Sequence, residues 1–71
     1  MSWSYDESLT SNRDKVRLKI GDVDTNDQLL SNETLDALLT EWGSDVMLTS
    51  IAAVRAIIAA FSRTLARSAA G

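Results

Sequence analysis

One segment of the sequence carries the residue types and the spacing of an ion site. Between Asp22 and Glu33, oxygen-bearing side chains occupy the first, third, fifth and twelfth positions: Asp22, Asp24, Asn26 and Glu33. Helix–loop–helix modules use this spacing to surround one calcium ion with oxygen ligands. The segment therefore offers calcium binding as one interpretation of the chain.

The sixth position of the segment departs from that pattern. EF-hand loops, and the dockerin modules that the run also resembles, normally have Gly where this chain has Asp27, because the turn needs a positive φ. Such loops also normally come in pairs, and this sequence holds a single copy. A polar turn followed by a helix explains the same residues, with Ser31 as N-cap and Glu33 in the first turn. The turn is the preferred interpretation, and it predicts no bound metal ion or cofactor.

The amino-acid composition excludes most catalytic mechanisms. The 71 residues include no Cys and no His, which excludes disulfides, thiolate nucleophiles and histidine acid–base catalysis. The Ser residues have no evident Lys base, and the three Gly residues are isolated and form no phosphate-binding loop. We therefore predict that the chain is not an enzyme and that it acts by binding other protein subunits.

The length and net charge of the chain also favour a protein that binds other subunits. A chain of this size buries only about 60% of its unfolded surface, so its own core is marginal and partner subunits are a usual supplement. The net charge of −3 provides no overall cationic surface for nucleic acid. Residues 1–7 lack the basic and apolar stretches of a signal peptide. We expect synthesis in the cytoplasm and association with other subunits.

The elements that must position these residues begin after a polar, aperiodic N-terminal arm, residues 1–10; residues 11–71 are expected to form a single helical domain. Lys15–Ile20 alternates basic and apolar residues as a strand does. The chain offers no second strand, however, and Ser11 and Gly21 can cap a helix. A helix over about 12–20 is predicted. Its basic residues either face solvent or face a partner, which is an acidic subunit or a phosphate backbone: Arg13, Lys15, Arg17 and Lys19.

Two further helices follow from apolar periodicity. Over about 32–42, Ser31 is the expected cap and the apolar stripe consists of Leu35, Leu38, Leu39 and Trp42. Ser44 is the expected cap of a third helix over about 45–68, roughly 36 Å long. The predicted fold is all-α, a small helical bundle of two short helices packed on one long C-terminal helix.

The third helix has two distinct faces. We expect its large side chains to cover the short helices: Val46, Met47, Ile51, Val54, Ile57, Ile58, Phe61 and Leu65. The other face has small side chains, including Ala53, and is either solvated or a subunit interface. Its lack of Lys and Glu favours the interface. The predicted interface residues are Ala52, Ala56, Ala59, Ala60, Arg63 and Arg67.

The third helix is not predicted to span a membrane. Its apolar stretch is about 17 residues long, which is short for a bilayer. Arg55 also lies in the middle of that stretch, where a charge is costly in lipid. We therefore predict no membrane partner.

Two runs of the sequence resemble a known family. Arg13-Asp14-Lys15-Val16-Arg17-Leu18-Lys19-Ile20-Gly21-Asp22-Val23-Asp24, followed by Leu29-Leu30-Ser31-Asn32-Glu33, is similar to the N-terminal part of small bacteriophage head–tail connector proteins, also called adaptor or head-completion proteins. These share R-D-x-V-R-x-x-I-G-D-x-D, a polar loop, L-L-S-[DN]-E and an Ala-rich long helix. The match spans about residues 12–68, and Gly21, Asp22 and Ser31 fall on motif positions that look structural.

The resemblance implies a virion structural protein. Such a subunit forms a homo-oligomeric ring beneath the portal, extends the DNA channel and contacts tail or neck proteins. DNA passes through the ring without sequence-specific binding, and the virion neck is assembled in the host cytoplasm. A calcium-binding interaction module and a small regulatory helical partner protein remain the alternative functions.

Overall fold

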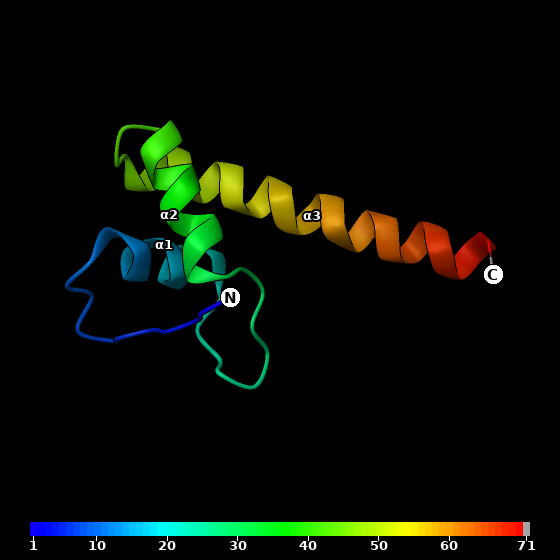
Figure 1. The fold of residues 1–71 in the computed structure, drawn as a ribbon, viewed down its shortest axis with the longest axis horizontal. Coiled ribbons are helices and arrows are strands. Elements are labelled where there is room, and N and C mark those ends of the chain that lie inside the picture. Colours follow the sequence, from blue (N-terminus) through cyan, green and yellow to red (C-terminus); the bar gives the residue numbers. More distant parts are fainter. Residues whose placement is uncertain (71) are drawn as a thin grey trace.

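The computed structural model describes the backbone of residues 1–70 and the side chains of residues 1–67. Within this range the elements are three helices: α1 (Asn12–Ile20), α2 (Asn32–Glu41) and α3 (Val46–Ala70). The two short helices pack on the long one (Figure 1). The predicted all-α fold is therefore confirmed, and the observed helix bounds lie within two residues of the expected ones.

The first helix forms because both of its ends are capped. Ser11 Oγ accepts a hydrogen bond from the Asp14 backbone N–H, which starts the helix. At the other end Gly21 adopts φ +79°, and the N–H groups of Gly21 and Asp22 bond back to the carbonyls of Leu18 and Arg17. Gly accepts this left-handed conformation without steric cost. The alternating sequence is thus a helix, as predicted.

The turn between α2 and α3 differs from the expected capping. Ser31 caps α2 as predicted, by accepting from the Thr34 N–H at 3.1 Å. Ser44 does not cap α3: it has φ +64°, and its N–H donates to the Leu39 carbonyl at 2.7 Å. Asp45 caps instead, with Oδ1 accepting from the Leu48 N–H at 2.9 Å. The helix therefore begins one residue later than expected.

The core shows that the expected covering face of α3 was wrong for most of its residues, with Val46 as an exception. Its buried apolar residues are Val16, Leu35, Leu39 and Ala53, with Ile20, Leu30, Leu38 and Val46 partly buried around them. On α3, Thr49, Ser50 and Ala53 are buried, whereas Ile58 is 57% and Phe61 62% exposed. The small residues of α3 let α1 and α2 approach its backbone closely. Leu35 and Leu39 therefore pack on the small face, and Trp42 is 41% exposed.

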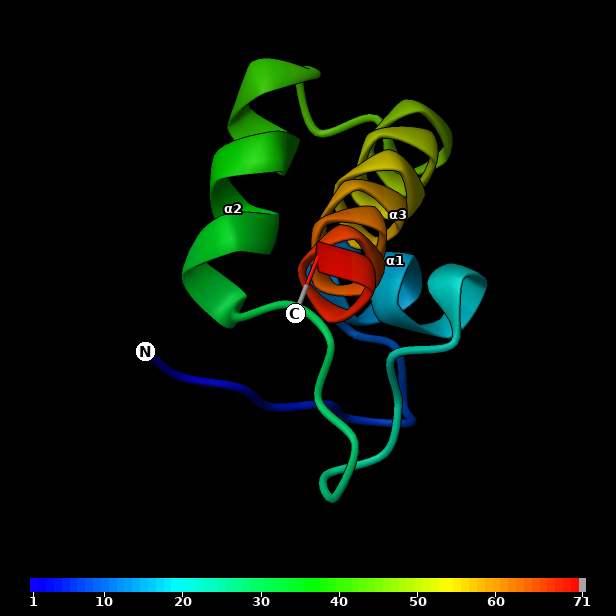
Figure 2. The same cartoon turned by 90° about the vertical axis from the view of Figure 1, so that its right-hand side faces the viewer.

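The long helix extends beyond the rest of the chain. Figure 1 shows that its C-terminal turns project past α1, α2 and the loops, and the described chain measures 43 × 26 × 20 Å. Residues 1–57 are called the platform here, and residues 58–67 the projecting segment. Figure 2 shows α2 and α1 on either side of α3. The platform is therefore the only part of the described chain where α3 is flanked by other helices.

Candidate functional site

The residues of the acidic segment do not converge on an ion. Asp22 is fully buried, and its carboxylate accepts hydrogen bonds from Arg17, from Trp3 Nε1 at 3.1 Å, and from the N–H groups of Leu29 and Leu30 at 3.0 and 3.1 Å. Both oxygens are thereby committed to the protein itself. Asp22 therefore has a structural role, in a buried network and not in an exposed polar turn.

The other candidate ligands have separate roles. Asp24 accepts from the Asn26 N–H at 2.8 Å within the turn. Glu33 accepts from the backbone N–H of Ser2 at 2.7 Å and from its hydroxyl, and these bonds lower the pKa of Glu33. Among the residues that the structure describes, no group of three or more His, Cys, Asp or Glu side chains could hold a metal ion. The geometry therefore gives the calcium alternative no support.

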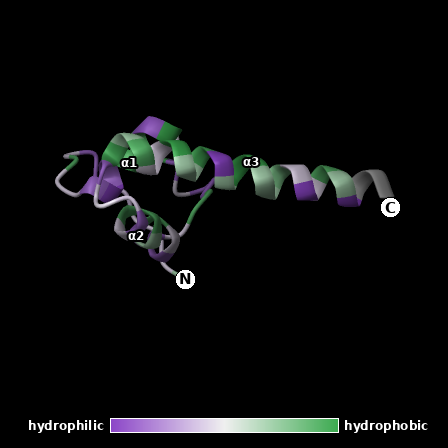
Figure 3. Ribbon diagram, turned by 90° about the horizontal axis from the view of Figure 1, so that it is seen from above, coloured by the Kyte–Doolittle hydropathy of each residue, from purple (hydrophilic) through white to green (hydrophobic). Residues whose placement is uncertain are grey.

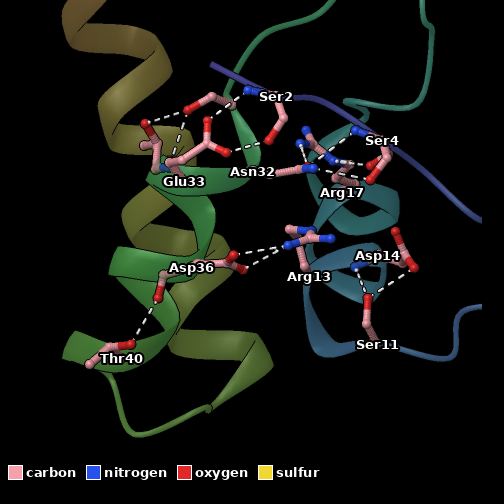
Figure 4. A network of polar contacts seen from close by, with 12 residues as sticks. Ser2, Ser4, Ser11, Arg13, Asp14, Arg17, Asn32, Glu33, Asp36 and Thr40 are labelled. Carbon is pink, nitrogen blue, oxygen red and sulfur yellow. Dashed lines mark hydrogen bonds and ion pairs between the residues drawn. The ribbon is translucent and has the colours of Figure 1, made fainter.

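A buried arginine organises the platform. Arg17 is fully buried; it pairs with Asp22, and donates to the carbonyls of Ser4 and Leu30 at 2.9 Å and to Asn32 Oδ1 at 2.7 Å. Figure 4 shows Arg17 and Asn32 directed toward each other, with Ser4 beside them. Burial lowers the pKa of Arg17 and the Asp22 carboxylate opposes that shift, so the guanidinium stays charged. We call Arg17, Asp22 and Asn32 the polar lock.

The polar lock was missed in the sequence. Arg17 was expected on a solvated or partner-facing flank of the first helix, yet it holds the N-terminal arm, α1, the loop and α2 together. Its guanidinium also lies 4.7 Å from the ring centroid of Trp3 in the arm, a cation–π distance. The available signal was Asp22 directly after the helix-ending Gly21, because Gly21 turns the chain back toward Arg17.

A second ion pair joins the two short helices. Arg13 Nη1 donates to both carboxylate oxygens of Asp36, at 2.9 and 3.2 Å (Figure 4). Asp14, also on α1, accepts from the Ser11 hydroxyl at 2.9 Å and from the Asp6 N–H at 3.2 Å. Lys15 and Lys19 remain exposed on α1. Two of the four basic residues of this segment are therefore structural.

The predicted subunit-interface residues are divided by the fold. Ala52 and Ala56 are half-buried, on the side of α3 that also buries Ala53. The others are exposed: Ala59, Ala60, Arg63 and Arg67. The alanine face is thus partly covered by the chain's own helices, whereas it was expected to be either solvated or a subunit interface. Its use as an interface stays a prediction.

The large side chains of α3 form an exposed apolar stripe instead. It consists of Met47, Ile51, Val54, Ile58, Phe61 and Leu65, all exposed. Figure 3 shows hydrophobic positions distributed along α3, including the projecting segment. Successive members are spaced by four, three, four, three and four residues, so they follow one side of a helix as the seam of a coiled coil does. Such a stripe is suited to packing against another helix.

Two grooves flank α3 within the platform. The first, about 510 Å³, is lined by Lys19 and Ile20 of α1 and by Met47, Ser50, Ile51, Val54 and Arg55 of α3. The second, about 370 Å³, lies between α2 and α3 and is lined by Leu38, Glu41, Trp42, Leu48, Ile51, Ala52 and Arg55. Both grooves have mainly apolar walls. The apolar stripe therefore forms one wall of the first groove and continues beyond it along the projecting segment.

The expectation that the apolar stretch of α3 is too short to span a membrane is contradicted. Val46–Arg67 comprises 22 residues with a mean hydropathy of 1.6, and it is long and apolar enough to cross a membrane by length and composition. Only 17% of the apolar window is buried in the structure. A buried core helix of a soluble protein passes the same test of length and composition, but this helix is mostly exposed. The stripe thus needs either a protein or a lipid surface to cover it.

No protein-family model, no curated protein and no solved structure matches this chain. The described residues themselves indicate what the chain is suited to do. They form a platform fixed by the polar lock and a long helix whose apolar stripe faces outward. This arrangement is suited to binding, because the stripe can pack against another helix and the charged residues of the polar lock are used in internal hydrogen bonds.

Proposed function

We propose that the chain is a virion structural protein, a subunit of the head–tail connector of a tailed bacteriophage. In this role it forms a homo-oligomeric ring between the portal and the tail or neck proteins, and the ring extends the DNA channel. The observation that carries the proposal is the apolar stripe on a rigid platform. A small protein that exposes so large an apolar surface needs partners to cover it.

The residues that carry the family resemblance give this proposal its second support. Arg17, Gly21 and Asp22 of the first run and Asn32 of the second all contribute to the platform. Gly21 provides the left-handed turn, and the other three form the polar lock. Residues shared for such a purpose preserve a fold and not a reaction, which is consistent with an assembly subunit.

The proposed contact with other subunits is the apolar stripe, with the exposed part of the alanine face beside it. Ala59 and Ala60 lie in the projecting segment, where the chain's own helices do not cover them. The acidic residues all lie in residues 1–45, and α3 contains three Arg and no acidic residue. A channel lined by such subunits can pass DNA without reading its sequence, since no base-recognition element is needed.

Co-assembly with the neighbouring virion proteins tests this function. The chain is expressed together with the portal and neck proteins of the same phage, and complexes are recovered through a tag on the portal. We expect co-purification of the wild-type chain and loss of binding in the Phe61→Asp variant, because that substitution places a charge in the stripe. Ala37→Asp, at an exposed position of α2, is the matched control. Failure of the wild-type chain to associate with any of these proteins would exclude the connector role.

Calcium provides a second, independent check. A bound ion at 100 times its dissociation constant would add about 2.7 kcal/mol to the free energy of unfolding. Because Asp22 is occupied by internal hydrogen bonds, millimolar calcium should leave the melting temperature unchanged. A large calcium-dependent rise that is abolished in Glu33→Gln would favour the ion-binding alternative.

A further inference from the structure

The apolar stripe has a spacing that is unchanged when it is followed in the opposite direction. The intervals of four, three, four, three and four residues are symmetric about the point between Val54 and Ile58. Two copies of α3 that run antiparallel can therefore align every member of one stripe with a member of the other. The resulting layers are Met47 with Leu65, Ile51 with Phe61, and Val54 with Ile58.

The platform also offers a place for the partner helix. The groove between α1 and α3 is bounded by Lys19 and Ile20 on one side and by the N-terminal half of the stripe on the other. The projecting segment carries the C-terminal half of the stripe. Its own hollow is smaller, about 240 Å³, and lies against the loop residues Gln28, Leu29 and Leu30. In an antiparallel pair, the projecting segment of each copy enters the groove of the other, so both halves of both stripes are covered.

Charge favours the antiparallel arrangement over the parallel one. All ten acidic residues lie in residues 1–45 with four basic residues, whereas α3 carries Arg55, Arg63 and Arg67 and no acidic residue. A parallel pair would place two acidic platforms side by side. The groove wall itself carries Lys19 and Arg55, so the favourable charge comes from residues 1–45 as a whole. An antiparallel pair places the basic C-terminal half of each α3 near this net acidic part of its partner and separates the two acidic parts from each other.

The surface involved is large enough for a specific contact. The six side chains of the stripe are each between 39% and 62% exposed. Together they expose on the order of 600 Å² per copy, which approaches the roughly 800 Å² per partner of a standard interface. Groups on the groove walls add to this area. The stripe is thus adequate for a dimer without any other protein.

We infer that the occupant of the stripe in the free protein is a second copy of this chain, bound antiparallel through α3. The inference goes beyond the proposed function. A two-fold contact of this kind is closed, so it covers the apolar surface before assembly, and ring formation exchanges it for contacts between neighbouring subunits. The dimer can be tested with the purified chain alone. Absence of the dimer and absence of portal binding are therefore separate results.

Cysteine cross-linking determines whether the pair exists and how it is oriented. The chain has no Cys, so single substitutions report without background. Met47 and Leu65 are exposed and lie about 27 Å apart along the helix axis. Met47→Cys and Leu65→Cys chains are purified separately, mixed under reduction, and then oxidised in a glutathione buffer. We expect a disulfide-linked heterodimer from the mixture and none from either variant alone.

The controls separate this arrangement from its alternatives. Ala37→Cys mixed with Leu65→Cys should give only the slow background of random collisions. A homodimer from Met47→Cys alone would establish a parallel pair and overturn the antiparallel one. If the mixture gives no disulfide above that background, the stripe does not bind a second copy. If the wild-type chain then co-sediments with vesicles of anionic lipid, the stripe binds a membrane surface instead.

Discussion

The two faces of α3 have opposite side-chain sizes and opposite exposure. The face toward α1 and α2 consists of small residues such as Thr49, Ser50 and Ala53, and it is buried. The other face carries large residues such as Ile58 and Phe61, and it is exposed. Large apolar residues usually mark the covering face of an amphipathic helix. Here the small face provides close helix packing, and the large face is left available for a partner.

The difference in exposure between the two faces follows from how little space the short helices leave beside α3. Val16, Leu35 and Leu39 of the short helices are buried in the core, and the polar lock is buried where the arm, α1, the loop and α2 meet. A third helix fits against these groups only through side chains that take little room. The large residues of α3 consequently contribute little to the platform's stability, and the polar lock contributes much of its order.

The substitution with the largest expected effect removes the carboxylate of the polar lock. In Asp22→Ala, Arg17 stays buried without its counter-charge, and breaking such a pair costs about 3–5 kcal/mol. We expect loss of most of the free energy of unfolding, measured by circular dichroism during denaturant titration. Asp24→Ala, in the exposed turn of the same loop, is the control and should change little. Equal stability of the two variants would mean that the lock does not hold the platform together.

Enlarging the buried face of α3 tests the comparison directly. Ala53 is fully buried in the core. Ala53→Leu should therefore cost about 1–3 kcal/mol through overpacking. Phe61→Ser, on the exposed face, should leave the stability within about 0.5 kcal/mol under dilute, monomeric conditions. Thermal melts of both variants provide the measurement. If Phe61→Ser were the more destabilising, the two faces would have been assigned the wrong way round.

A smaller effect is expected at the start of α2. Ser31 Oγ accepts the Thr34 N–H at 3.1 Å, and loss of such a cap costs about 1 kcal/mol. Ser31→Ala should therefore lower the melting temperature by roughly 4–8 °C in a domain of this size. Ser44→Ala is the matched control, because Ser44 does not cap α3. A drop of similar size in the control would show that capping is not the cause.

The smallest effect concerns the pH dependence of the arm. Hydrogen bonds from Ser2 lower the pKa of Glu33 below its ordinary value of 4.5. The unfolded chain therefore takes up this proton at a higher pH than the folded chain does. The stabilisation is present above about pH 4.5 and is lost as the pH falls through the folded pKa. Melting temperatures between pH 6 and pH 3 should fall less in Glu33→Gln than in wild type; identical slopes would exclude this contribution.

The helices could be predicted from the sequence because their signals are local. Ser11, Gly21 and Ser31 mark helix ends through hydrogen bonds to residues a few positions away, and the structure places them there. The two faces of α3 could not be assigned in the same way. Periodicity separates large from small residues, but which side meets α1 and α2 depends on how much space the other helices leave.

The polar lock could not be predicted from local sequence signals either. Arg17 lies in an alternating basic segment whose neighbours Lys15 and Lys19 are exposed. Its partners Ser4, Leu30 and Asn32 are 13 to 15 residues away in the chain. Only the folded chain brings them together. The turn within the acidic segment, by contrast, could be predicted, because Asp24 accepts a hydrogen bond from the Asn26 N–H only two residues away.

The central claim is that the apolar stripe, and not the alanine face, holds two copies of the free chain together. Ile58 and Ala59 are adjacent and exposed, and they lie on different faces of α3. Native mass measurements on Ile58→Asp and Ala59→Asp, each checked for wild-type helicity, compare the two faces with the same added charge. We expect Ile58→Asp to be monomeric and Ala59→Asp to associate as wild type does. An associated Ile58→Asp beside a monomeric Ala59→Asp would contradict it.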